Sequence, residues 1–241
     1  MLEKNSFDGD VVYLYIDESQ DGNQSDENSS LYLCASLILC EYKDIIVDTL
    51  KITKEKLKND QFVGLNKKSI NKLLHYNDDN EEVRTKVTDE IRMMFFKSYI
   101  AKMKFNENKY DYVYYSLLKS ILKNRVVKYK NRTLIIRYEQ NPKITKKGIQ
   151  SVVDSVLESI AKDKKHIIKS LPEVEEVTKD DLLVSIPDYS LGLYLTYSKE
   201  KKKDKPKKYI LYRFEKIRSK IRLFIDLDNS TYFSRKTYKY I

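Results

Sequence analysis

The chain has 241 residues, of which 41% are hydrophobic, and its formal net charge is +10. This length allows one large domain, or one domain with a small appendage. No apolar stretch approaches the roughly 20 residues that a membrane-spanning helix needs, and the first ten residues are polar, without a signal-peptide core. We therefore expect a cytoplasmic protein without a membrane partner.

Cysteine, histidine and lysine usage narrows the class of protein further. Six residues of extended chain separate Cys34 from Cys40; they span roughly 20 Å, too far for a disulfide, so we expect free thiols. His75 and His166 are the only histidines, and no zinc-site spacing is present. A basic chain attracts polyanions, most commonly nucleic acid. An AT-rich coding genome would also produce many lysines, so charge alone leaves the function open.

The first third of the chain predicts two strands and two helical segments. We expect strands at 11–17 and 31–39, joined by a polar loop with turn-forming residues. A helix should follow at 41–59, and a shorter helical stretch at 67–74 leads to His75. The first helix is expected to turn four aliphatic side chains inward: Ile45, Ile46, Leu50 and Leu57.

The middle of the chain alternates helices and strands. A helix should begin at Asp78-Asp79, followed by a strand at 99–105 with one wet face. A tyrosine-rich helix at 108–123, a strand at 133–138 and a helix at 146–163 come next. The helix that begins at Asp78-Asp79 carries apolar residues three or four apart: Val83, Val87, Ile91, Met94 and Phe95.

The last part predicts a fifth strand at 181–186, ended by Pro187, and a helix from Asp188 to Ser198. A lysine run at 199–208 is the best candidate for a flexible connection. An amphipathic, basic helix is expected at 209–225.

This order of elements predicts an α/β fold with a mixed five-stranded sheet covered by helices on both faces. Early strands joined without a helix can pair antiparallel, and later strands separated by helices should run parallel. We divide the chain into a main domain (1–198), a lysine-rich linker (199–208) and a basic C-terminal helix with its tail (209–241).

Four acids stand at the ends of predicted elements. Asp17 and Glu18 follow the first apolar strand, Glu139 ends the fourth strand, and Asp188 opens a helix. Several carboxylates that converge can hold Mg²⁺ or Mn²⁺, and two such ions can hydrolyse a phosphodiester. The alternatives are ordinary ones: Asp188 as a helix N-cap, Glu139 as an exposed acid, and His75 as a hydrogen-bonded histidine at a helix end.

The segment Tyr-Ile-Asp-Glu-Ser (15–19), followed by Asp21-Gly22, resembles the opening signature of the "domain of unknown function 3800" proteins of bacteria and phages. The resemblance covers about residues 10–198. It continues in His75, in Glu139 and in Asp188, which lies within Ile-Pro-Asp-Tyr-Ser-Leu-Gly-Leu (186–193). The chain departs from the family at Gln20, where glycine is usual, at Leu73, where Glu is common, and at Glu139, where Asp is more frequent.

The resemblance implies an RNase H-like fold and a nuclease that uses two Mg²⁺ or Mn²⁺ ions. Asp17 would bridge both metals, and Glu139 and Asp188 would each complete one of them. Glu18 would be an accessory ligand or would orient a water, and His75 would carry a proton or contact a phosphate. The resemblance also implies a protein partner in a bacterial defence or mobile-element assembly.

An alternative is a catalytically degenerate protein that binds nucleic acid or acts as a scaffold subunit, which the departure at Leu73 favours. Nucleic acid, DNA or RNA, is the expected partner in both cases. Basic residues near tyrosines can contact phosphates, although such lysines also commonly form a solvated face. The predicted contacts are Lys102, Lys104, Lys128, Lys130, Arg132, Lys201, Lys202 and Lys203.

Overall fold

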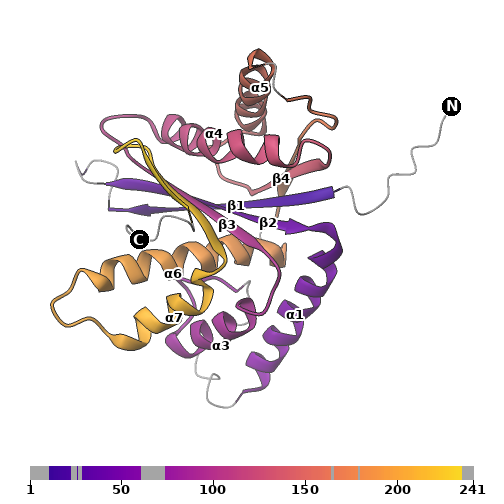
Figure 1. The fold of residues 1–241 in the computed structure, drawn as a ribbon. Helices are drawn as coiled ribbons and strands as arrows, with labels where there is room; N and C mark the ends of the chain where they lie inside the picture. The colour runs from indigo at the N-terminus through magenta and orange to yellow at the C-terminus, as the bar shows by residue number, and fades with distance from the viewer. Residues whose placement is uncertain are drawn as a thin grey trace.

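The computed structural model of the chain describes residues 11–22, 26, 29–60, 74–163, 166–178 and 180–234. In this part of the chain one sheet has the strand order β5-β4-β1-β2-β3-β6-β7 (Figure 1). Its strands are β1 (Val11–Asp21), β2 (Ser30–Leu39), β3 (Lys97–Lys104), β4 (Thr133–Glu139), β5 (Glu173–Val177), β6 (Ile221–Asp226) and β7 (Thr231–Ser234).

The sheet is mixed, as the sequence predicts. Strand β1 pairs antiparallel with β2, and β2 pairs antiparallel with β3. The pairs β1–β4, β4–β5 and β3–β6 are parallel. The expected number of five strands is too low, because β6 and β7 extend the sheet beyond β3.

Helices cover both faces of the sheet (Figure 1). The helices α4 (Tyr110–Lys128) and α5 (Lys146–Lys162) lie on one face. The helices of the other face are α1 (Cys40–Asn59), α3 (Glu81–Ile91), α6 (Ser185–Lys201) and α7 (Lys208–Arg218). No helix in the described ranges is long and apolar enough to cross a membrane.

Side-chain alternation along β1 divides the core into two layers. Leu14 and Ile16 pack in the cluster that contains the α4 and α5 side chains. Tyr15 packs in the other cluster, with residues of α6 such as Tyr189. Because neighbouring residues of a strand point to opposite faces, this alternation determines on which face each polar residue at the end of the apolar run lies.

The C-terminal third differs from the prediction in two places. The fifth strand is Glu173–Val177 rather than 181–186, since 182–184 forms a 3₁₀ turn that leads directly into α6. Three glutamates in this edge strand hide its β pattern. The predicted helix at 209–225 ends at Arg218, and 221–226 is β6. The stripe of Ile217, Ile221 and Phe224 keeps a helical spacing across that turn by coincidence.

The first third differs in the length of β1 and in two inward positions. Strand β1 continues to Asp21, because its pairing with β2 extends to Ser30, and Gly22 then turns the chain with φ +85°. Ile45 and Phe95 are 62% and 63% exposed, whereas the other predicted inward residues of their two stripes are buried. Of the predicted helical stretch at 67–74, only Leu74 lies within the described residues; Leu73 lies outside them.

The cysteines and a chain of hydroxyls complete the interior between the sheet and α6. Cys34 and Cys40 are free thiols, as expected. Ser36 and Ser98 hydrogen-bond to each other at 2.7 Å, and Ser98 donates to Ser190 of α6 at 3.1 Å. Buried hydroxyls need such partners, and their small side chains let α6 pack directly on β2 and β3.

Candidate active site

Strand register brings Asp17 and Glu139 together. Ile16 of β1 pairs with Tyr138 of β4 in parallel, so the next residues, Asp17 and Glu139, lie side by side on strands about 4.8 Å apart. Both side chains lie on the face of the sheet that α6 covers. Asp17 comes two residues after Tyr15, and Glu139 comes two residues after Arg137, and residues two apart in a strand point to the same face. The Arg137 guanidinium donates to the Tyr15 hydroxyl at 2.7 Å.

Asp188 reaches the same corner from the first turn of α6. Pro187 is tolerated beside it because the first turn needs no intrahelical N–H partner. Val184 is the N-cap, without a side-chain cap hydrogen bond. The Asp188 Oδ2 instead accepts a hydrogen bond from the Tyr76 backbone N–H at 2.7 Å. The carboxylate of Asp188 thus joins α6 to the loop before α3, and does not act as the helix N-cap.

His75 lies beside Asp188, as the sequence hypothesis requires. Its Nε2 is 3.8 Å from the Asp188 Oδ1, and its side chain is 45% exposed. The Nδ1 is buried and has no hydrogen-bond partner among the described residues. One imidazole nitrogen therefore faces the carboxylate, while the ring is accessible from solvent.

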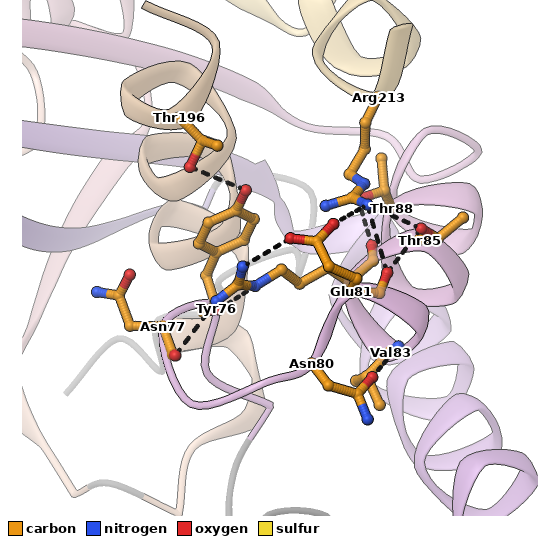
Figure 2. Close-up of polar contacts among 10 residues, drawn as sticks. Tyr76, Asn77, Asn80, Glu81, Val83, Thr85, Thr88, Thr196 and Arg213 are labelled. Carbon is orange, nitrogen blue, oxygen red and sulfur yellow. Dashed lines mark hydrogen bonds and ion pairs between the residues drawn. The ribbon is translucent and has the colours of Figure 1, made fainter. Parts of the chain in front are cut away.

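The loop that carries His75 is braced by side chains of α3 and α6 (Figure 2). The Tyr76 hydroxyl donates to the Thr196 Oγ1 at 3.0 Å, and Arg84 Nε donates to the Tyr76 carbonyl at 2.7 Å. The Tyr76 ring packs on α6 at Gly192, where a Cβ atom would collide with it. These contacts hold the backbone N–H of Tyr76 against Asp188.

A second brace fixes the start of α6 to the sheet. Asp181 caps the 3₁₀ turn by accepting from the Leu183 N–H at 3.0 Å. The same carboxylate accepts from the Tyr15 hydroxyl at 3.3 Å and lies 3.8 Å from Arg137 Nη1. Since Tyr15 and Arg137 are neighbours of Asp17 and Glu139 on their strands, Asp181 sets α6 relative to both acids.

The charges of these acids act on one another. Burial raises the pKa of Asp17 well above its ordinary value, and the charges of Asp188, Glu18 and Glu139 raise it further. Burial also raises the pKa of Asp188 to about 6, although His75 and the Tyr76 N–H lower it. Glu139 is among the groups that raise the pKa of Asp188. Mutual repulsion of this kind requires carboxylates close to one another in a region poor in water.

Glu18 lies near these acids but on the opposite face of the sheet. Its Oε1 accepts hydrogen bonds from Asn141 Nδ2 at 2.6 Å and from the Tyr110 hydroxyl of α4 at 3.2 Å. Burial raises the pKa of Glu18, whereas these two donors lower it. The alternation along β1 thus separates Glu18 from Asp17, and its predicted role as an accessory ligand stays a prediction.

Asp79 belongs to the same region and was not among the predicted site residues. Burial raises its pKa to about 6, against the lowering effect of a hydrogen bond from the Tyr189 hydroxyl and of His75. Its position four residues after His75 could have indicated from the sequence that Asp79 belongs to the site. The pair Asp78-Asp79 also fits the start of a helix, however. Tyr110 and Asn141, which hold Glu18, were not foreseen either, because their partner is distant in the sequence.

The predicted nucleic-acid contacts do not form one surface. Lys102 lies 3.5 Å from the Asp226 carboxylate and 3.6 Å from the Asp228 carboxylate, and Lys203 is paired with Glu200 at 2.7 Å. Residues 128–132 lie at the other end of the sheet, where β4 begins. The predicted residues near the end of β1 and α6 are Lys102, Lys104, Lys201, Lys202 and Lys203; those at the far end are Lys128, Lys130 and Arg132.

The donor set at this corner fits a hard divalent cation. Asp17, Glu139 and Asp188 provide only carboxylate oxygens, which Mg²⁺ and Mn²⁺ prefer. The raised pKa values of Asp17 and Asp188 reflect a negative site that a cation would stabilise. In the described ranges no group of three or more His, Cys, Asp or Glu side chains is already arranged to hold a metal, so binding requires these side chains to turn toward a common point. Comparison with protein-family models and with curated proteins finds no match for this chain.

Proposed function

We propose that the chain is a metal-dependent nuclease that hydrolyses phosphodiester bonds of nucleic acid at Asp17, Glu139 and Asp188. The observation that carries this proposal is the meeting of half-buried Asp17 of β1 and Glu139 of β4 with buried Asp188 of α6. The charges of Glu139 and Asp188 raise the pKa of Asp17. Gathering like charges in a buried place is unfavourable unless something of opposite charge compensates it. A polyanionic substrate would add to that repulsion, so a cation must accompany it.

The three acids have distinct positions in this proposal. Asp17 is the acid on which the charges of both Asp188 and Glu139 act. It would therefore be shared by two Mg²⁺ or Mn²⁺ ions, with Glu139 and Asp188 each holding one. Such ions supply charge neutralisation at the phosphate and a more acidic water. The rigid strands and the braced start of α6 set where the carboxylates stand.

His75 is placed to handle a proton beside the acids. Its Nε2 faces Asp188, and the exposed part of its ring can contact water or substrate. An imidazole exchanges protons near neutral pH, so His75 would hold or release a proton at Nε2 during hydrolysis. Asp79, whose pKa is raised to about 6 and which interacts with His75, would help to position this ring.

An RNase H-like fold is part of the same proposal. The mixed sheet with helices on both faces agrees with what the resemblance to the domain of unknown function 3800 proteins implies. The order Asp17, His75, Glu139 and Asp188 along the chain, with all four now near one corner, supports it further. A partner protein in a bacterial defence or mobile-element assembly belongs to the resemblance alone and stays a prediction.

A nuclease assay tests the proposal directly. The purified chain should degrade single-stranded or double-stranded DNA or RNA in Mg²⁺ or Mn²⁺, and a chelator should abolish the activity. The double variant Asp17→Asn, Asp188→Asn should be inactive while its circular dichroism spectrum stays unchanged. Asp154→Asn, at an exposed position of α5, is the matched control and should retain full activity. Equal activity in the double variant would exclude this site.

A second candidate is a nucleic-acid-binding protein without turnover. The absence of a ready three-ligand group within the described residues favours it. This candidate predicts salt-dependent binding of nucleic acid, no product with either metal, and the same affinity in the double variant as in the unchanged chain. The assay above, combined with a binding titration at several salt concentrations, separates the two candidates.

A further inference from the structure

A cavity of about 400 Å³ lies at the end of the sheet where β3 and β6 begin. This volume falls in the range of about 300–1,000 Å³ that is typical of small-molecule sites. Its walls come from α4, β3, β6 and β7, and its lining contains no acidic residue. The lining residues are Lys97, Tyr99, Arg125, Lys128, Arg222, Leu223 and Ser234.

Four of the lining residues are cationic, and they repel one another. Burial lowers the pKa of Lys128, and the charges of Lys97, Arg125 and Arg222 lower it further. Arg125 lies over the Tyr99 ring, 4.2 Å from its centroid. The cations thus line one cavity from a helix and two strands, and Lys128 also reaches solvent.

Two other half-buried cations of this protein have acidic partners. Arg137 pairs with Glu175 at 2.7 Å, and Lys216 pairs with Asp89 at 2.7 Å. In the described ranges, by contrast, no ion pair involves Lys97, Arg125 or Lys128. The Arg125 Nε is buried there and has no hydrogen-bond partner. A buried donor without a partner is costly, and an anion in the cavity would satisfy it.

We propose that this cavity binds an anion that contains two or more linked phosphate groups. Two guanidinium groups can each hold phosphate oxygens in pairs, and two ammonium groups add point charges. The concentration of four cations around one cavity suits several negative charges close together, and the volume exceeds what a single small anion needs. A free diphosphate and the backbone of a nucleic acid share this chemistry. The partly enclosed shape favours the compact ligand.

This site is separate from the acidic corner. Tyr99 packs in the core layer of α4 and α5, whereas Ile100 packs in the layer of α6. Lys97 and Tyr99 therefore face α4, on the side of the sheet opposite to Asp17 and Asp188. Lys97 also lies level with Leu14 rather than with Asp17, since both Lys97 and Leu14 pair with Leu37.

Isothermal titration with pyrophosphate in the presence of a chelator tests the proposal. The unchanged chain should bind it saturably. The double variant Lys128→Gln, Arg222→Gln should bind at least about tenfold more weakly, because two charged contacts are lost. Lys123→Gln removes one lysine charge of α4 outside the cavity lining and should leave the affinity unchanged. Asp17→Asn should also leave it unchanged, which separates this site from the proposed nuclease centre.

Backbone amide NMR shifts locate the ligand without any variant. Pyrophosphate should move the amide signals of residues around Lys128 and Leu223, and not those around His75 and Asp188. A short oligonucleotide without terminal phosphates forms the second arm. If it binds at Lys128 and competes with pyrophosphate at similar affinity, the source is a nucleic-acid backbone; if only pyrophosphate binds, the source is a free ligand. Absence of saturable binding in both arms, or equal affinity in Lys128→Gln, Arg222→Gln, would overturn the proposal.

Discussion

Two neighbouring regions of this protein bury charge in opposite ways. At the contact of α3 with α7, Arg213 is only 4% exposed, and it donates to the Glu81 carboxylate and to the Thr85 hydroxyl (Figure 2). At the acidic corner, Asp188 is 7% exposed and lies among other acids that raise its pKa. The same short segment, from His75 to Thr85, contributes to both regions.

We infer from this difference that the contact of Arg213 with Glu81 stabilises the fold, whereas the acidic corner at Asp188 is suited to bind a ligand. The charge of Arg213 is balanced within the protein by Glu81, and breaking such a pair leaves a buried charge without its partner. A group of like charges is unfavourable in the isolated protein and becomes favourable when a counter-ion arrives. The cationic cavity at Lys97 and Arg125 belongs to the second kind, with the opposite sign.

Replacing Asp17 should reduce nuclease activity far more than replacing its neighbour Glu18. Asp17→Asn should reduce nuclease activity a hundredfold to a thousandfold, the usual effect of removing one group that stabilises developing charge. Glu18→Gln should reduce it less than about tenfold, since Glu18 is held on the other face by Asn141 and Tyr110. Initial rates of cleavage in Mn²⁺ measure both effects. Equal losses would mean that the two carboxylates act together.

The second prediction concerns the pH dependence of the metal-free protein. The pKa of Asp188 is about 6 in the folded chain against an ordinary value of 3.8. A raised carboxyl pKa means that the folded state binds the proton more tightly. Its contribution is therefore fully present below pH 3.8 and is lost as the pH rises through about 6. The difference between the two values corresponds to about 3 kcal/mol.

Urea unfolding between pH 4 and pH 7.5, with a chelator present, measures this contribution. Asp188→Asn should make the protein more stable than the unchanged chain at pH 7.5, and this advantage should shrink toward pH 4. Asp154→Asn provides the control for other acids that titrate in the same range. An advantage of Asp188→Asn that is constant over this range would contradict the raised pKa.

A methyl group at Gly192 should disturb the acidic corner through its packing. The Cβ atom of alanine would collide with the Tyr76 ring, and at Gly148 it would collide in the same way with Tyr115. Each substitution should destabilise the fold by about 1–3 kcal/mol. Only Gly192→Ala should also weaken Mn²⁺ binding, because Tyr76 donates its backbone N–H to Asp188. Thermal unfolding and Mn²⁺ titration of both variants distinguish the two effects.

The smallest effect on cleavage is expected at the pair of Arg213 and Glu81. Arg213→Met should destabilise the protein by about 2 kcal/mol, less than for a fully buried pair because the Glu81 side chain is half-exposed. Arg92→Met replaces an exposed side chain at the end of α3. It should change stability by less than about 0.5 kcal/mol. Cleavage rates measured well below the melting temperature should be unchanged in both variants. A loss of activity in Arg213→Met would show that the α3–α7 contact also supports the site.

Periodicity predicted the elements whose pattern reflects burial on one side, such as α5 with Ile149, Val153 and Val156. It failed at β5, an edge strand with three glutamates, and at β6, where Ile221 and Phe224 continue a helical spacing. Local pattern does not contain the tertiary pairing that decides such cases.

The candidate site was predictable where an apolar run of a strand ends in an acid, as for Asp17 and Glu139. The contacts that hold the site in place were not. Asp188 accepts from Tyr76, and Glu18 accepts from Tyr110 and Asn141; each partner is distant in the sequence. Strand alternation places Asp17 and Glu18 on opposite faces of the sheet. Which of them meets Glu139 follows only once the register between β1 and β4 is known.

Anomalous diffraction from crystals soaked in Mn²⁺ tests whether Asp17, Glu139 and Asp188 hold a metal together. We expect anomalous density between their three carboxylates, and its loss in crystals of Asp17→Asn. Crystals that diffract well and show no anomalous density at this corner, with the three carboxylates turned to separate partners, would contradict it.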